Sequence, residues 1–441
     1  MERGDRKAKL QEGIKSIVIP PLCYIPVCKS TDTWKTILQA VPAECHAFTT
    51  KARVPALMFF EVEEHPEKLD VASFLSLELN QYVADSATTI TPSLNAVAED
   101  VDIATDEKSN RRQSLFKKLD PSLLADVLNQ KLGSVSEDID EGVGNRRLSI
   151  FKGKGPLPLA DEDNDDVTMD ILHARNNFKE KALKIQQASP YGHLENWIFD
   201  GVLAKSNDDV RQEVFVMQLI SHYDRLFKEE GIHVWLHPYR IMNTSKTTGL
   251  IQLIPNAMSF DGVKKSESYP GSFKGYFEVL YNIIRKKESS TSSIHPLQEH
   301  FPKHTAFEYI VAVDNYIKSM AAYSIVGYLL AIKDRHNGNI MLDTMGHVIH
   351  IDFGFVFGIA PGKQFSMERA PWKLTEELAA VMMPSLAVNE KIEIDDLLEA
   401  PLFKHFMKLC LDCFKAARKH GDEVATMLEI MSHQSQYPAF R

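Results

Sequence analysis

The sequence predicts an α+β fold of two lobes, in which a β-rich lobe is followed by a mainly helical lobe. Three observations predict this fold. Short β-type runs separated by prolines occupy residues 13–82. Strand-like and helix-like patterns alternate over residues 177–254. Residues 255–441 have mainly helical patterns, so we expect the first two regions to form one lobe and the third to form the other.

The individual helices and strands can be predicted in chain order. Residues 1–12 are polar and have no apolar signal core, and we expect them to form a tail. Apolar and β-branched runs predict strands at residues 17–19, 56–62, 199–204, 234–242 and 250–254. An apolar face from Asp208 onward predicts a helix. The stretch from Thr305 to Ile332 is largely apolar and predicts a long, buried helix.

Composition and charge exclude several classes of protein. The chain has 441 residues and a net charge of −10, which disfavours a general nucleic-acid binder because phosphate contacts need lysine and arginine. Its five cysteines are too few for a disulfide framework, and the lone pair Cys410 and Cys413 predicts buried helix positions rather than a zinc site. The longest apolar stretch is too short to span a bilayer, so we expect a soluble or peripheral protein.

Residues 83–176 form an insert that we expect to be disordered, because its apolar residues are scattered among Ser, Asp, Asn and Lys. The insert contains a repeat, in which residues 110–117 recur in closely similar form at residues 145–152. Both copies read Arg-Arg-x-Ser followed by an apolar residue, a pattern that basophilic protein kinases accept. This predicts regulatory phosphorylation of Ser114 and Ser149, and a duplicated linker without regulation is the alternative.

Two motifs after the long helix carry the chemistry. Asp334 and Asn339 lie five positions apart, and Asp352 opens an Asp-Phe-Gly triplet after a predicted strand at residues 347–351. Protein kinases use the same interval and triplet, with the Asn and the second Asp binding Mg²⁺. Carboxylate and amide oxygens suit this ion. The sequence therefore predicts an ATP-dependent phosphotransferase with Asn339 and Asp352 as metal ligands. A polar loop and a strand-end aspartate without catalytic function are the alternative.

The loop around Asp334 departs from protein kinases in one respect. It reads Asp-Arg-His where they read His-Arg-Asp, and this order resembles the phosphoinositide kinases and their protein-kinase relatives. His336 would then accept a proton or stabilise charge near the attacking hydroxyl, because histidine titrates near neutral pH. We assign Asp334 and His336 jointly to this hydroxyl as catalytic residues, and the division of roles between them stays open.

Two upstream segments, residues 189–197 and 202–213, extend the resemblance to the class III phosphatidylinositol 4-kinases, closest to the beta type. The resemblance implies a two-lobed, protein-kinase-like fold with ATP in the cleft between the lobes. It implies that Lys205 binds the ATP phosphates during catalysis and that Glu213 orients Lys205. An ammonium group in a half-buried cleft needs such a carboxylate partner to stay charged.

The same resemblance implies further contacts to the cofactors, which are ATP and Mg²⁺, with Mn²⁺ as an alternative metal. A polar turn between two early strands would contact the phosphates, and a plain hairpin turn is the alternative reading of its residues Thr49, Thr50 and Lys51. Residues 249–257 resemble the family's hinge between the lobes, so the backbone of Leu253 or Ile254 would hydrogen-bond adenine. Tyr239 would line the same pocket.

The segment after Asp352 should bind the lipid head group. It carries few basic residues, whereas kinases of multiply phosphorylated inositides need a dense basic cluster. Its basic residues are Lys363, Arg369 and Lys373. This favours unphosphorylated phosphatidylinositol as the substrate. Phe355 follows the triplet where phosphoinositide 3-kinases typically carry His, so the resemblance implies transfer of the γ-phosphate of ATP to the inositol 4-hydroxyl.

Three alternative functions remain. A phosphatidylinositol 3-kinase and a protein kinase related to the phosphoinositide kinases would share both motifs. Phe355 disfavours both alternatives, because phosphoinositide 3-kinases typically have His at this position and the related protein kinases usually have Asp. The third alternative is a catalytically inactive adaptor, which is disfavoured because the chain retains Lys205, Asp334, His336, Asn339 and Asp352.

The resemblance also implies a cellular setting. We expect a cytoplasmic protein on the surface of the Golgi, another endomembrane or the plasma membrane. We expect a small GTPase or an adaptor protein as its recruiting partner, and no nucleic acid. The resemblance is loose over residues 13–82 and close over residues 189–441. Family members normally have a helical domain before the kinase and further helices after the segment that ends here at Arg441, so we expect this chain to lack those last helices.

Overall fold

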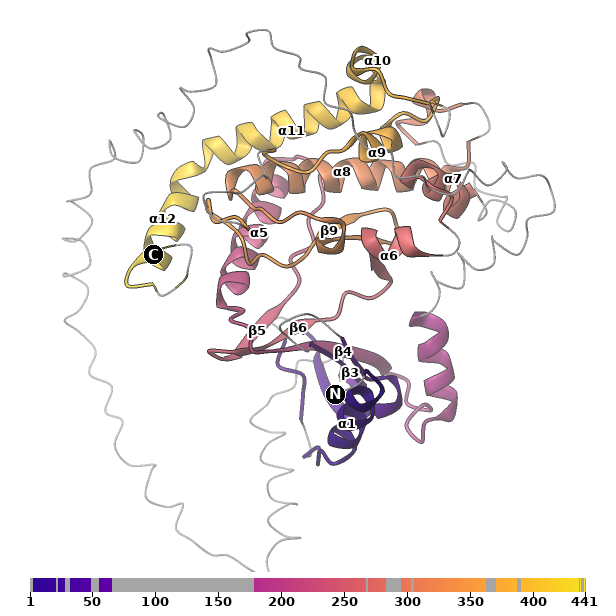
Figure 1. Cartoon of the computed structure of the whole chain (residues 1–441), viewed down its shortest axis with the longest axis vertical. Helices are drawn as coiled ribbons and strands as arrows, with labels where there is room; N and C mark the ends of the chain where they lie inside the picture. The colour runs from indigo at the N-terminus through magenta and orange to yellow at the C-terminus, as the bar shows by residue number, and fades with distance from the viewer. Residues whose placement is uncertain are drawn as a thin grey trace, which may run out of the picture. The chain divides into compact units, whose positions relative to one another are not determined.

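The computed structural model describes the larger part of the chain. The described residues are 3–20, 23–27, 32–48, 55–65, 178–266, 269–282, 295–302, 305–361, 370–386, 390–435, 437 and 440. Within them the secondary structure comprises a six-stranded sheet, a three-stranded sheet and a set of mostly C-terminal helices (Figure 1). The predicted insert over residues 83–176, with Ser114 and Ser149, lies outside the described residues.

The six-stranded sheet is antiparallel and joins segments that are far apart in sequence. Its strands are, in spatial order, β1 (Trp34–Ala40), β3 (Ala56–His65), β4 (Trp197–Ser206), β6 (Thr248–Gln252) and β5 (Ile241–Ser245), and β2 (His46–Ala47) pairs with β3. The pairing of β3 with β4 runs from Ala56 opposite Ala204 to Glu63 opposite Trp197. The central strands are rich in Phe, Val, Ile and Leu, which pack well on a pleated surface.

Helix α5 (Arg211–Glu229) connects this sheet to the helical part of the molecule. Its buried face includes Phe215, Leu219 and Tyr223, which lie in one hydrophobic cluster with Ile251 of β6 and Tyr323. α5 contacts both β5 and the long helix α11 (Pro401–Lys419). Phe215, Leu219 and Tyr223 lie four positions apart, which is the spacing of one face of a helix.

The helical part surrounds helix α8 (Phe307–Leu329), which packs against α7 (Phe273–Asn282), α11 and β9 (Val348–His350). Small residues such as Ala321 and Ala322 are fully buried along it and allow close approach of the neighbouring elements. The other elements of this part are α6 (Phe260–Lys265), α7 (Phe273–Asn282), α9 (Glu376–Ala379), α10 (Ile394–Glu399), α12 (Gly421–Ser432), and the sheet of β7 (Ala257–Ser259), β8 (Ile340–Asp343) and β9 (Val348–His350). Among the described helices, none combines the length and apolar character that crossing a bilayer requires.

The structure confirms the predicted strands at residues 56–62 and 199–204, the helix after Asp208 and the long helix that is now α8. The prediction of a strand at residues 17–19 is wrong, because these residues form no ladder and Val18 is 88% exposed. The strand predicted at 234–242 begins only at Ile241, since Pro238 lacks the backbone donor that a ladder needs. The expected N-terminal tail is largely helix α1 (Arg3–Lys15), which is rich in good helix formers but has little apolar periodicity.

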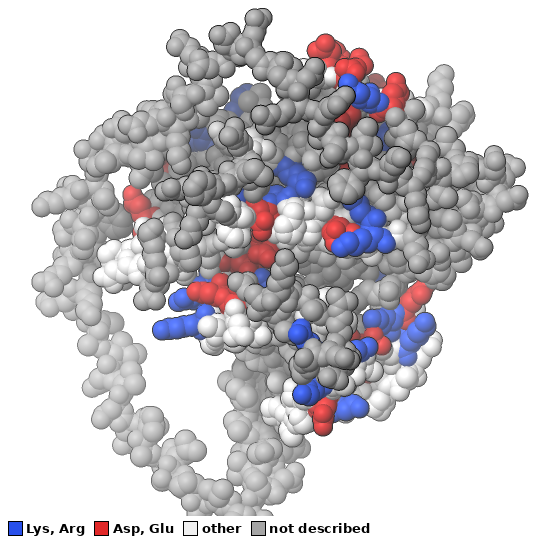
Figure 2. Space-filling view, viewed as in Figure 1, with Lys and Arg blue, Asp and Glu red and all other residues white. Residues whose placement is uncertain are grey.

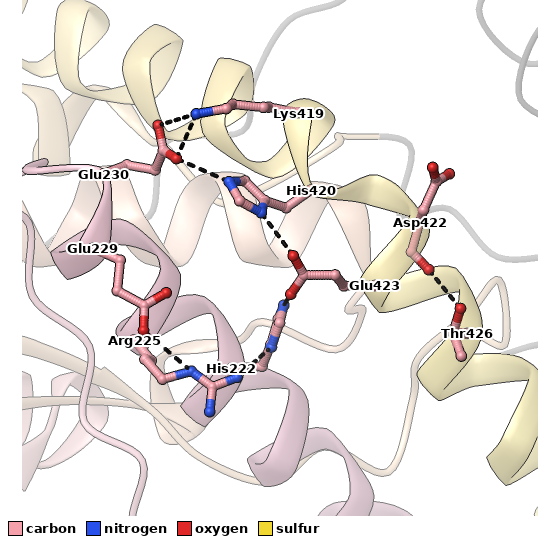
Figure 3. A network of polar contacts seen from close by, with 9 residues as sticks. All are labelled: His222, Arg225, Glu229, Glu230, Lys419, His420, Asp422, Glu423 and Thr426. Atoms are coloured by element: carbon pink, nitrogen blue, oxygen red, sulfur yellow. Dashed lines mark hydrogen bonds and ion pairs between the residues drawn. The ribbon is translucent and has the colours of Figure 1, made fainter.

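A polar network joins the C-terminal end of α5 to the junction of α11 and α12 (Figure 3). Lys419 Nζ lies 2.8 Å from Glu230 Oε1, and the two ring nitrogens of His420 lie 2.9 Å from Glu230 and 2.8 Å from Glu423. Hydrogen bonds to Glu423 and Glu230 raise the pKa of His420. Burial lowers the pKa of nearby His222, whose Nε2 lies 3.7 Å from Glu423.

Charged side chains of both signs lie on the surface. On the face shown in Figure 2, the described Lys and Arg side chains are interspersed with Asp and Glu. Among the described residues, several oppositely charged side chains lie one helical turn apart, as in the contact of 2.7 Å between Lys408 and Asp412 on α11. Such exposed pairs contribute little to stability.

We predict that the His420 network stabilises the fold more at pH 6 than at pH 8. The raised pKa of His420 means that its contribution is complete below the ordinary histidine pKa of about 6.5 and is lost as the pH rises through the higher folded-state value. The pKa values of Glu230 and Glu423 are lowered by hydrogen bonds, chiefly to Lys419 and to His420 respectively, so their contribution is lost only at more acidic pH. Urea unfolding of His420→Gln should therefore show a larger loss at pH 6 than at pH 8.

The exposed His433 at the end of α12 offers a matched control, because His433→Gln removes a histidine that makes no contact of this kind with the described part of the chain. Equal losses for His420→Gln at both pH values would contradict the assignment of the protonated ring to this network.

Candidate active site

The hairpin of β8 and β9 brings the two predicted catalytic motifs together. The loop of residues 333–339 leads into β8 through a short 3₁₀ turn (Asn337–Asn339), and the Asp-Phe-Gly triplet follows β9. Because Ile340 pairs with His350, the start of β8 lies beside the end of β9. The backbone N–H of Ile351 donates to the carbonyl of Asn339 at 3.0 Å. The predicted metal ligands are thus neighbours in space.

The predicted residues of the loop contact one another. Asn339 is 7% exposed, and its side-chain nitrogen donates to the backbone carbonyl of Asp334 at 3.0 Å and lies 3.4 Å from the Asp334 carboxylate. The amide oxygen of Asn339 is then the atom that would face a cation. Asp334 and Asp352 have φ values of 63° and 59°. A left-handed backbone conformation is less favourable than a right-handed one for aspartate. It persists where contacts with neighbouring residues stabilise it.

Arg335 supplies much of that support, although sequence analysis assigned it no role. Arg335 is 6% exposed as a residue, and a guanidinium group is buried at low cost only where its donors find acceptors. It donates to the carbonyl groups of Lys333 at 3.0 Å, Asn339 at 3.3 Å and Ile351 at 2.8 Å, and to that of Asp352. The guanidinium carbon also lies 5.3 Å from the centre of the Phe353 ring. Arg335 therefore holds the loop against the triplet.

His336 has a defined tautomer. Its Nδ1 accepts a hydrogen bond from the backbone N–H of Gly338 at 3.0 Å, and a backbone N–H can only donate. The neutral ring consequently carries its proton on Nε2. A β-carbon at position 338 would lie 2.9 Å from the imidazole, so the glycine makes this close approach feasible.

The predicted pair of Lys205 and Glu213 is present. Lys205 on β4 donates to Glu213 on α5 at 2.7 Å, and its ammonium lies 3.6 Å from Asp208. Burial raises the pKa of Glu213 to about 7, although the positive charge of Lys205 acts to lower it. Burial by itself would lower the pKa of Lys205, but the charges of Glu213, Asp352 and Asp208 outweigh burial and raise it. Lys205 therefore stays protonated in this cluster of carboxylates.

A cavity of 270 Å³ lies between the larger sheet and β8. Leu57 and Phe59 of β3 line it, together with the predicted hinge residues Leu253 and Ile254 and with Leu342 of β8. Leu57 lies opposite Leu203, and side chains two positions apart share a face of a strand, so Lys205 projects from the same face of the sheet.

The remaining predicted residues fall in three groups. Tyr239 does not line this cavity; its ring is buried and lines a separate cavity of 430 Å³ beside Val214 and Met217. Lys373, predicted to bind the head group, donates to the side chain of Asn337 in the loop of residues 333–339 at 2.9 Å. The residues that lie outside the described part of the chain are Thr49, Thr50, Lys51, Lys363 and Arg369.

The donor set fits Mg²⁺. Among the described residues, no three His, Cys, Asp or Glu side chains are grouped as a metal cage. Asn339 and Asp352 instead offer hard oxygen ligands from two segments that Arg335 holds together. Mg²⁺ commonly takes one or two protein oxygens and completes its shell with water and phosphate. One carboxylate oxygen of the nearby Glu213 is buried without a partner among the described residues, which is compatible with further cationic or donor groups in the site.

The fold and this arrangement of residues define a kinase-like α+β domain. The family model for phosphatidylinositol 3- and 4-kinases matches residues 201–440. The chain therefore belongs to the phosphatidylinositol 3- and 4-kinase family.

Several curated proteins are similar to this chain. Phosphatidylinositol 4-kinase PIK1 of Saccharomyces cerevisiae is 37% identical over 312 residues, which cover 70% of this chain and 27% of that protein. Phosphatidylinositol 4-kinase PIK1alpha of Candida albicans is 36% identical over 294 residues, or 64% of this chain and 27% of the relative. Phosphatidylinositol 4-kinase beta of Sorex araneus is 36% identical over 295 residues, which cover 67% of this chain and 32% of that protein. The chain thus spans about a quarter to a third of the length of these relatives.

We predict a strong energetic coupling between Lys205 and Glu213. Either Lys205→Met or Glu213→Leu removes one partner of a buried ion pair and should lower the free energy of unfolding by about 2–3 kcal/mol. The double variant should lose little more than either single variant, because it removes both charges. Urea unfolding of the four proteins measures the coupling.

The exposed pair of Lys408 and Asp412 has the same 2.7 Å separation and provides the control cycle. Its coupling should be below about 1 kcal/mol. Losses that simply add for Lys205 and Glu213 would show that the buried contact carries no special energy.

Proposed function

We propose that this chain is the catalytic part of a lipid kinase that transfers the γ-phosphate of ATP to the inositol 4-hydroxyl of phosphatidylinositol. The observation that carries the proposal is the convergence of Asp334, Asn339 and Asp352 at the β8–β9 hairpin, within the electrostatic reach of Lys205 and Glu213. Phosphoryl transfer requires such a combination of positive charge, metal ligands and a group beside the attacking hydroxyl. The names of the similar proteins support the lipid substrate and the 4-position.

The proposal includes a two-lobed arrangement with ATP in the cleft. Residues 13–82 and 177–254 would form the N-terminal lobe around the insert, and residues 255–441 the other lobe; the pairing of β3 with β4 supports the first of these. Adenine would occupy the 270 Å³ cavity beside Leu253 and Ile254. Its phosphates would extend along the same face of the sheet towards the ammonium group of Lys205.

Each charged residue then has a separate task. Lys205 would bind phosphate oxygens, and Glu213 would keep its ammonium directed at them. Asn339 and Asp352 would hold Mg²⁺. When bound, the ion neutralises charge on the phosphates and orients them. Arg335 maintains the distance between the two ligands through its bonds to backbone carbonyls on both segments.

The tautomer of His336 suggests how the two catalytic residues divide the work. With Nδ1 occupied by Gly338, the ring presents an N–H at Nε2, which donates a hydrogen bond to developing negative charge. Asp334 is then the better acceptor for the proton of the inositol hydroxyl. A proton-accepting role for His336 would require the other tautomer and the loss of the Gly338 bond.

The substrate would be met at a membrane surface. Lys373 lies beside the catalytic loop through Asn337, where its charge would favour a phosphodiester. Lys363 and Arg369 would complete the head-group contacts. A peripheral position on a cytoplasmic membrane face, with recruitment by a small GTPase or an adaptor, is part of the same proposal.

We predict that the chain converts phosphatidylinositol in vesicles to phosphatidylinositol 4-phosphate and that Asp352→Ala reduces the rate by about 10²–10³-fold. The measurement is incorporation of labelled phosphate, with the product isomers separated. Asp396→Ala on the exposed face of α10 is the matched control and should retain the wild-type rate. A 3-phosphate product would favour the alternative of a phosphatidylinositol 3-kinase, and phosphorylation of protein but not lipid would favour the protein-kinase alternative.

A further inference from the structure

The first turn of α5 contacts the active site through two consecutive residues. Glu213 binds Lys205, as described above. Gln212, which precedes it, is 6% exposed, and its side-chain nitrogen donates to the backbone carbonyls of Phe353 at 3.2 Å and Gly354 at 2.9 Å. These two residues directly follow Asp352. The same helical turn is thus bonded to the phosphate-binding lysine and to the segment that carries a metal ligand.

Three consecutive carbonyl groups, those of residues 352–354, accept hydrogen bonds from side chains. Residues 351–355 belong to no strand or helix. The carbonyl of Asp352 accepts from Arg335, and the next two carbonyls accept from Gln212. Buried carbonyl groups need such partners. Two side chains from different elements therefore hold the segment in which Asp352 keeps its unfavourable φ of 59°.

We propose that Gln212 is a positioning residue that keeps Asp352 oriented towards the metal site and couples this orientation to the pair of Lys205 and Glu213. The inference rests on the proposed function. It assigns the coupling to the amide N–H donors, because the amide oxygen of Gln212 is buried without a partner among the described residues. Only a side chain that carries N–H donors at the position of the Gln212 amide nitrogen can bond to the carbonyls of both Phe353 and Gly354.

The chemistry of the position predicts which replacements fail. Methionine has a similar length but no donor, and glutamate has a similar shape but presents a carboxylate to two carbonyl oxygens. Either replacement leaves the buried carbonyl of Phe353 and the part-buried carbonyl of Gly354 without their partner, which is more costly than the loss of an exposed hydrogen bond. The backbone of residues 352–354 can recover hydrogen bonds by turning its carbonyl groups towards water. This movement would displace Asp352.

The test measures nucleotide binding rather than turnover. A fluorescent ATP analogue is titrated into wild type, Gln212→Met and Gln212→Glu, once in excess Mg²⁺ and once in EDTA. We expect the variants to bind the Mg²⁺ complex about tenfold more weakly than wild type while metal-free binding is unchanged. The ratio of the two affinities is the readout, because a general loss of stability would weaken both. Gln218→Met, on the exposed side of the same helix, is the control and should keep the wild-type ratio.

The outcomes separate the inference from the proposed function. Wild type without Mg²⁺-dependent nucleotide binding would contradict the metal site of the proposed function. Mg²⁺-dependent wild type together with an unchanged ratio in Gln212→Met would overturn the role of Gln212 alone. If Gln212→Met shows no cooperative thermal unfolding, Gln212→Asn decides instead. It keeps the buried amide but withdraws the donors by one methylene, so a wild-type ratio in that variant also overturns the inference.

Discussion

The burial of one guanidinium group determines the geometry of the candidate active site. A charged side chain removed from water must find acceptors for its donors, and Arg335 finds them in backbone carbonyls on both sides of the β8–β9 hairpin. Asp334 precedes it in the chain, and Asp352 contributes one of the carbonyls. The loop of residues 333–339 and the Asp-Phe-Gly triplet can therefore separate only by leaving the buried guanidinium of Arg335 without partners. This is why a loop and a strand end form one site.

Helix α5 relates this site to the larger sheet. One hydrophobic cluster extends from Ile251 of β6 through Phe215 and Leu219 of α5 to Tyr323 of α8 and Phe353 of the triplet. On top of this apolar contact, the polar residues at the start of α5 bind Lys205 on one side and the backbone after Asp352 on the other. Packing thus sets the position of the helix, because apolar cores are close-packed. Hydrogen bonds set the orientation of the charged groups, because they are directional.

The charges around Lys205 explain why the site needs such support. Three carboxylates, those of Asp208, Glu213 and Asp352, act on one ammonium group. Burial opposes the charged form of Glu213, whose pKa rises to about 7, while the same carboxylates keep Lys205 protonated. A site with excess negative charge is costly in a protein by itself, and it suits a divalent cation bound together with phosphate. The preorganised backbone keeps these groups from moving apart.

The sequence by itself determined the features that depend on neighbouring residues. The interval between Asp334 and Asn339 specified a short loop whose residues contact one another, the apolar runs specified β3 and β4, and the apolar stretch around Ala321 specified α8. The tertiary structure decided the features that depend on partners distant in the chain. Those include the pairing of β3 with β4, the position of Tyr239 in a separate cavity, the bond of Lys373 to Asn337, and the bonds made by Arg335 and Gln212. Local patterns encode periodicity and turn chemistry, but the acceptor of a buried donor is chosen by which backbone the whole core brings within about 3 Å.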